Sequence, residues 1–137
     1  MIAKAGDIYC VYNKLLKKYT ACQVTKIDES GKKPQAIIIS LDWASDELPK
    51  EEELALMKPL YIDYMYWNGT FNLKKVDVNV PSNYVYVGNV KPVNNEDTGT
   101  YGGWSIDIEV YNQFKWEKIP KEQRDVFKAA DASSEHV

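Results

Sequence analysis

The chain has 137 residues, a formal net charge of -3 and a hydrophobic content of 45%, which suits one folded domain and argues against disorder. Lysine supplies nearly all of the positive charge, because Arg124 is the only arginine. Proteins that read nucleic acid cluster Arg and Lys against phosphate oxygens, so the composition argues against a DNA or RNA platform. We expect a single domain over residues 1–137, with its core at about 5–119.

The first forty-odd residues predict an antiparallel meander. Strand-like runs cover Asp7–Tyr12, Tyr19–Ile27 and Ala36–Trp43, separated by short polar joints. The third run is apolar on both faces, so we expect a strand inside the sheet with cover on both sides. The rest of the chain is predicted to cover or close this sheet.

An acidic segment follows the third strand. Ser45 or Asp46 can cap a helix, and the acidic residues up to Glu53 suit the positive end of its dipole. The segment predicts a short helix that ends before Pro59.

The next segment predicts an aromatic hairpin. Leu60–Trp67 is a strand by composition, Asn68-Gly69 is a hairpin turn signal, and Thr70–Val80 supplies the return arm.

The last third of the chain predicts further strands and a helix. Tyr84–Val87 is strand-like, and Lys91–Gly103 is polar enough for an exposed loop. Apolar and acidic residues alternate over Trp104–Tyr111, which indicates a strand that continues around a bend through Asn112–Ile119.

The C-terminal part predicts one helix. Pro120 suits its first position, the helix is expected over about 120–130, and the small polar tail 131–137 is expected to fray. The predicted fold is mainly β: a bent antiparallel sheet or a partly open SH3-like barrel, with one short internal helix and a C-terminal helix.

Cysteine usage and the N-terminus bear on the compartment. Cys10 and Cys22 both fall in predicted strands, which favours free buried thiols in a reducing cytosol; a cross-strand disulfide is the alternative. The first residues lack the apolar run of a signal peptide, and no window is apolar enough for a membrane helix. We expect a cytoplasmic protein with no membrane contact.

The residues that usually carry catalysis are scarce. The only histidine is His136, in the predicted tail, so a nucleophile–histidine pair or a zinc site is not expected. We predict no enzyme activity, no metal and no cofactor. Asp42 and Asp63 lie in otherwise apolar strands, where each is either buried with a raised pKa or turned outward at an edge.

Aromatic and acidic residues are the best candidates for contact with a partner. Tyr and Trp are enriched at interface hot spots, and an acidic patch suits a basic protein, although core packing and a solvated helix face explain the same residues. The candidate contact residues are Tyr61, Tyr64, Tyr66, Trp67, Asp46, Glu47, Glu51 and Glu52.

Short motifs resemble a family of bacterial immunity proteins that accompany polymorphic and contact-delivered toxins. They are Gly6-Asp7-Ile8-Tyr9, the run from Lys18-Tyr19 to Val24, Tyr86-Val87-Gly88 with Pro92 nearby, and Gln113-Phe114-Lys115-Trp116. The resemblance implies a non-enzymatic protein that binds and neutralises a cognate toxin. It carries over no binding residue.

A second resemblance leads to a different function. Gly6-Asp7-Ile8 and the run from Lys33-Pro34 to Ser40 resemble growth-inhibitor endoribonucleases with an SH3-like barrel. That family has arginine where this chain has Lys33, and the two are not equivalent at a phosphoryl transition state. A third alternative is a domain that binds a small ligand or peptide in a pocket formed by Tyr64, Tyr66 and Tyr86.

Overall fold

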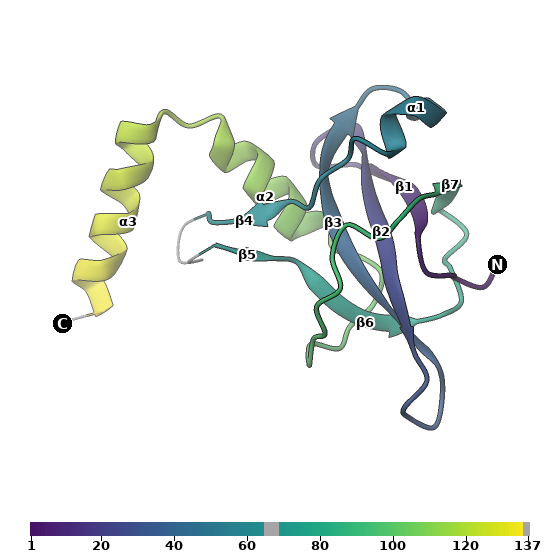
Figure 1. Cartoon of the computed structure of the whole chain (residues 1–137). Coiled ribbons are helices and arrows are strands. Elements are labelled where there is room, and N and C mark those ends of the chain that lie inside the picture. The colour runs from purple at the N-terminus through teal and green to yellow at the C-terminus, as the bar shows by residue number, and fades with distance from the viewer. Residues whose placement is uncertain (65–68, 136–137) are drawn as a thin grey trace.

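The computed structural model describes residues 1–64 and 69–135 and is mainly β (Figure 1). The strands are β1 (Asp7–Asn13), β2 (Lys18–Asp28), β3 (Gln35–Ser45), β4 (Tyr61–Ile62), β5 (Thr70–Phe71), β6 (Leu73–Asp77) and β7 (Val85–Asn89). The helices are α1 (Glu51–Leu54), α2 (Asp107–Glu117) and α3 (Lys121–Glu135).

The predicted meander is confirmed and forms the centre of a five-stranded antiparallel sheet with the order β6-β3-β2-β1-β7. As expected, β3 lies inside the sheet, between β2 and β6. The mainly β fold is therefore confirmed in its open-sheet form. The sheet does not close into a barrel, because within the described ranges β6 and β7 pair with one neighbour each.

Strand alternation divides the core between the two faces of the sheet. Tyr9 and Val11 belong to a first core cluster, which α2 and the segment before it cover through Trp104 and Val110. Ile8 and Cys10 point to the other face and belong to a second core cluster, which α1 covers through Leu54. Both faces are apolar because both are covered.

The two cysteines cannot form a disulfide with each other. The register pairs Cys10 with Ala21 and Tyr9 with Cys22, so the thiols point to opposite faces of the sheet. Both are free and buried, as the sequence favoured. Burial raises the pKa of Cys10 to about 12 and also raises the pKa of Cys22.

Close packing of α1 on the sheet requires glycine at position 88. A Cβ there would lie 2.5 Å from Cδ1 of Leu54, at a backbone φ of +157° that L residues rarely adopt. We expect Gly88→Ala to lower the free energy of unfolding by about 2 kcal/mol. The penalty should shrink in a Leu54→Ala background, measured by urea unfolding in a double-mutant cycle. Equal penalties in both backgrounds would contradict this contact.

The strand predicted over Trp104–Tyr111 is wrong. Residues 107–117 form α2 instead, and the motif Gln113–Trp116 lies within this helix. Ile106, Val110 and Gln113 are buried at helical spacing, whereas Ile108 is 65% exposed. A strand would have buried Ile108 beside its apolar neighbours.

Other predicted boundaries need smaller corrections. Within the described residues, the aromatic strand is β4, Tyr61–Ile62, which pairs with β5, and residues 65–68 of the predicted hairpin lie outside the described residues. The internal helix begins after Lys50, with no side-chain cap from Ser45 or Asp46. The C-terminal helix is correct in kind, but it continues to Glu135, past its expected end at about residue 130 and into the segment that was expected to fray.

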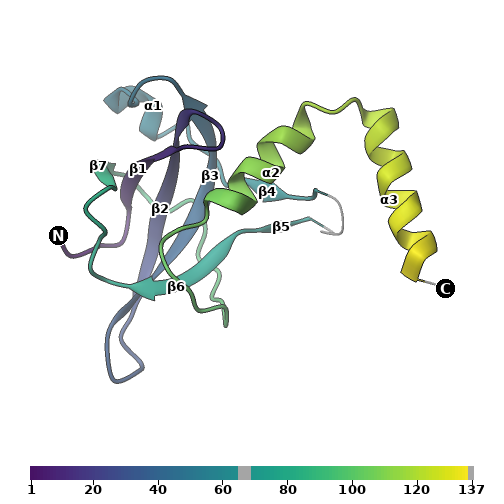
Figure 2. The same ribbon diagram turned by 180° about the vertical axis from the view of Figure 1, so that it is seen from behind.

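Helix α3 stands away from the sheet, as both views show (Figures 1 and 2). Among the side chains that the structure describes, Phe127 contacts the body of the protein, with its ring centroid 6.2 Å from that of Trp116 on α2. Lys128 Nζ also lies 5.9 Å from the centre of the Trp116 ring. The β4–β5 hairpin projects from the same side of the sheet.

Candidate partner-binding surface

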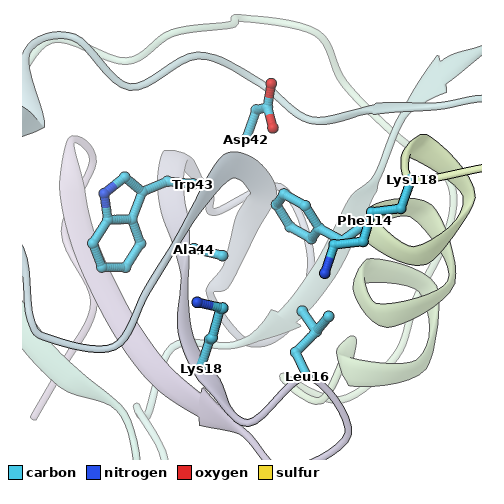
Figure 3. Close-up of a pocket in the computed structure, with 7 residues that line it drawn as sticks. All are labelled: Leu16, Lys18, Asp42, Trp43, Ala44, Phe114 and Lys118. Carbon is cyan, nitrogen blue, oxygen red and sulfur yellow. The ribbon is translucent and has the colours of Figure 1, made fainter.

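An open groove of about 380 Å³ lies between the end of β3 and the second half of α2 (Figure 3). Three chain segments form its walls: the β1–β2 joint, the C-terminal part of β3, and α2 with the residue after it. The lining residues are Leu16, Lys18, Asp42, Trp43, Ala44, Phe114 and Lys118. We call it the β3–α2 groove.

The groove exists because β3 is longer than one of its neighbours. The pairing with β6 ends at Ile39–Leu73, while the pairing with β2 continues to Ser45. Beyond that point, the Asp42 amide donates to the Lys58 carbonyl oxygen at 2.7 Å. The end of β3 therefore projects past β6, next to α2.

The groove has aromatic groups from two elements, Trp43 from β3 and Phe114 from α2. Phe114 packs against the first core cluster, and Trp43 packs against the second. In Figure 3, Phe114 and Trp43 lie on opposite sides of the β3 ribbon. Both rings are half-buried, so each keeps area for a ligand without leaving the core.

The rim of the groove carries charges of both signs. The sequence left two positions open for Asp42, buried in the sheet or turned outward at an edge. The structure shows the second, because Asp42 is exposed. Lys18 Nζ lies 3.4 Å from Asp46 Oδ1, in an exposed ion pair. Solvent screens such a pair, so it is readily exchanged for one with a partner.

Gln113 fixes the wall of the groove to the aromatic hairpin. The residue is 1% exposed. Its Oε1 accepts hydrogen bonds from the Asp63 amide at 2.8 Å and the Tyr64 amide at 3.1 Å. Its Nε2 donates to Asp63 Oδ1 at 2.7 Å and to Glu117 Oε1 at 3.3 Å. One buried amide thus holds two backbone groups and two carboxylates.

The carboxylates around this amide repel one another. The pKa of Glu117 is raised first by its partial burial and then by the charges of Asp42 and Asp63, while Gln113 and Arg124 oppose the shift. Asp42, at the groove, and Asp63, at the hairpin, therefore act on the same side chain. A cation placed here would relieve the repulsion.

A smaller pocket lies beside this cluster, between the hairpin and α3. Asp63 and Trp116 form one wall, and the first two turns of α3 form the other. The lining residues from α3 are Lys121, Arg124, Asp125 and Lys128. The basic side of α3 thus lies next to the carboxylates.

The predicted aromatic contacts take different positions. Tyr61 is 53% exposed and rests on Phe71, with ring centroids 5.7 Å apart. Tyr64 is half-buried and packs against the first core cluster. Tyr66 and Trp67 lie outside the described residues. The ligand-pocket alternative gains no support from Tyr86, which lines a pocket with Met1, Ile2, Lys4 and Asp7 rather than with Tyr64.

The predicted acidic contacts are all exposed. Asp46 and Glu47 follow β3, and Asp46 reaches the groove through its ion pair with Lys18. Glu51 and Glu52 lie on the first turn of α1, which covers the second core cluster. Tyr61 is on that side too, because Phe71 packs against the same cluster. The structure thus joins Asp46 to the groove, and it places Tyr64 on the face of the first core cluster, opposite Glu51, Glu52 and Tyr61.

Sequence reasoning missed most of the groove. The spacing along α2 carries the missed signal. Phe114 is four residues before Lys118, and Gln113 is four residues before Glu117, so the two members of each pair lie on the same side of the helix. A helical reading of the late motif would have paired them. Trp43 gave no such signal, because a tryptophan at the end of an apolar run reads as core.

Other kinds of site find little support in the described part of the chain. No group of three or more Cys, His, Asp or Glu side chains is arranged to hold a metal ion there. None of the helices described combines the length and apolar character that a membrane crossing requires. Lys33, the position that matters for the ribonuclease resemblance, is exposed in the β2–β3 turn.

Comparisons with known proteins gave no match to a family model, a curated protein or a solved structure.

Proposed function

We propose that this chain is an immunity protein: a non-enzymatic inhibitor that binds a cognate bacterial toxin in the cytoplasm and blocks it. The opening motif at Gly6-Asp7 and the late motif at Gln113–Trp116 support this family of functions by resemblance. The β3–α2 groove supports it by geometry. The β3–α2 groove is the observation on which the proposal rests.

The groove has the composition of an interface centre. Two half-buried aromatic rings, Trp43 and Phe114, offer rigid apolar area, and Asp42 offers a charge at the rim. Aromatic anchors surrounded by polar groups are typical of protein interfaces. The groove is open and shallow, which suits a protruding side chain or loop of a protein.

The acidic segment beside the groove favours a basic partner, although Lys18 and Lys118 also line the groove. Between Asp42 and Glu53 the chain has six carboxylates and one lysine, Lys50, and Asp63 and Glu117 add to the negative charge nearby. Toxins that act on nucleic acid need basic surfaces to hold phosphates. An acidic inhibitor placed on such a surface would exclude the substrate, and opposite charges would speed the encounter.

The first test is co-expression with the toxin-like protein encoded next to this gene. We expect the toxin alone to arrest growth, the pair to grow, and the two proteins to co-purify. Growth arrest with RNA cleavage by this chain alone would instead support the ribonuclease alternative. No relief of toxicity and no complex would overturn the proposal.

The groove itself is tested by reversing one charge. Asp42→Lys should weaken toxin binding about tenfold or more, mainly through slower association, because the exposed rim charge would repel a basic partner. Glu29→Lys makes the same change in the exposed β2–β3 turn, far from the groove, and should leave affinity within about twofold. Biolayer interferometry at two salt concentrations measures both. Equal losses for the two variants would show that only net charge matters.

A further inference from the structure

The two edges of the main sheet differ. The edge at β6 is covered by other parts of the chain, and we call it closed. The Lys75 amide donates to the Thr100 carbonyl oxygen at 2.8 Å, and the Gly102 amide donates to the Lys75 carbonyl oxygen at 3.1 Å. Trp104 Nε1 donates to the Asp77 carbonyl oxygen at 2.8 Å. The loop before α2 therefore occupies the outward backbone groups of β6, as natural edge strands require.

The edge at β7 is open. This strand pairs with β1 on one side, and no described strand lies on its other side. An antiparallel strand of this length presents about two or three residues with outward N–H and C=O groups. Its sequence, Val85–Asn89, contains no charge, so it lacks the lysine or other charge that usually protects an edge.

Apolar side chains are exposed around this edge. Val85 is 41% exposed and Tyr86 44% exposed, and the nearby Met1 and Ile2 are more exposed still. A shallow pocket lies beside the strand, between Tyr86 and the N-terminal residues. A second strand placed along β7 would cover these groups.

We propose that β7 pairs with β7 of a second copy of this chain, antiparallel and about a two-fold axis, so that one sheet continues through a dimer. An uncharged strand can lie opposite itself without repulsion, which a charged edge could not do. A two-fold contact uses the same patch on both copies. Since the β6 edge is closed, growth stops at two copies and no filament forms.

The local geometry restricts where the axis passes. A β-bulge interrupts the β1–β7 register between Ile8 and Tyr9, and Gly88 is held against Leu54. Val87 is the extra residue of this bulge, so the regularly paired part of β7 is Val85–Tyr86. We place the axis near Tyr86, where the two copies of this residue face each other.

The dimer leaves the β3–α2 groove free and does not depend on the proposed function. β1 and β2 lie between β7 and β3 in the sheet, and Figures 1 and 2 show β7 on the side away from α3. Each copy would carry its own groove.

Cross-linking tests the axis directly. Directly opposite residues of antiparallel strands have Cα atoms about 4.5–5.5 Å apart, within the range of a disulfide. Under mild oxidation, Tyr86→Cys should form a covalent dimer, and Tyr101→Cys, exposed on the closed edge, should not. The native thiols do not interfere because both are buried. No more dimer from Tyr86→Cys than from Tyr101→Cys would overturn the proposal.

Sedimentation measures the dimer of the unmodified chain. We expect a dimer at concentrations up to about 1 mM, where even weak association is populated. Val85→Lys and Tyr86→Lys should both be monomeric, and Tyr101→Lys should remain dimeric. Two variants are needed because Tyr86 also packs on Tyr9; circular dichroism checks that each is folded. A monomeric wild-type chain, a larger assembly, or a folded Val85→Lys dimer would contradict the inference.

Discussion

Raising the pH from 8 to 11 should unfold this protein, because four weakly acidic side chains are buried in its cores. Burial raises the pKa of Cys10 to about 12 and is also the main cause of the raised pKa values of Cys22, Tyr9 and Tyr84. The folded chain keeps these protons at a pH where the unfolded chain releases them. Stability is therefore intact below the unfolded pKa values and falls as the pH rises above them.

The size of this effect approaches the whole stability of a small domain. Each such group costs about 1.4 kcal/mol per pH unit above its unfolded pKa. The two thiols alone then remove about 6 kcal/mol by pH 11, and Tyr9 and Tyr84 add to this loss above about pH 10. Domains of this kind have about 5–15 kcal/mol in total. Urea unfolding at a series of pH values, followed by far-ultraviolet circular dichroism, measures the slope.

A variant without the thiols separates their contribution from that of general charge. The double variant Cys10→Ala/Cys22→Ala should be less stable at pH 7, because it leaves small cavities. Between pH 9 and 10, however, its stability should fall much less steeply than that of the wild type. Parallel slopes would mean that the thiols ionise in the folded chain, contrary to their burial.

The meander was predictable because its signal is local. Each strand alternates or is continuously apolar over its own length, and the turn at Gly31 separates β2 from β3. The same local method failed at α2. The six residues from Ile106 fit a period of two, but the burial of Ile106, Val110, Gln113 and Trp116 follows a helical period. Only a window extended to Trp116 separates the two patterns.

The candidate site was less predictable because it is not local. Its walls come from Leu16, from Asp42–Ala44 and from Phe114 with Lys118, segments that meet only in the folded chain. Asp42 drew attention by its charge within an apolar strand. Trp43 and Phe114 did not, because a half-buried aromatic ring reads as core until its exposed side is seen.

Gln113→Glu should destabilise the protein by about 3–5 kcal/mol at pH 7, the range found when a buried charge lacks a partner. The new carboxylate could still accept hydrogen bonds from the Asp63 and Tyr64 amides. Its second oxygen, however, would replace an amide donor that now faces the carboxylates of Asp63 and Glu117. Three carboxylates would meet with no proton between them.

This penalty should depend on pH. Burial and the neighbouring carboxylates raise the pKa of the introduced carboxyl above its unfolded value of about 4.3, so the penalty is absent below that pH and grows as the pH rises. Gln123→Glu, an exposed position on α3, makes the same change in solvent and should stay within about 0.5 kcal/mol of wild type. Urea unfolding from pH 4 to pH 7 measures both variants. A small, pH-independent loss at position 113 would mean that the amide does not join the hairpin to α2. The wall of the β3–α2 groove would then be free to move independently of β4.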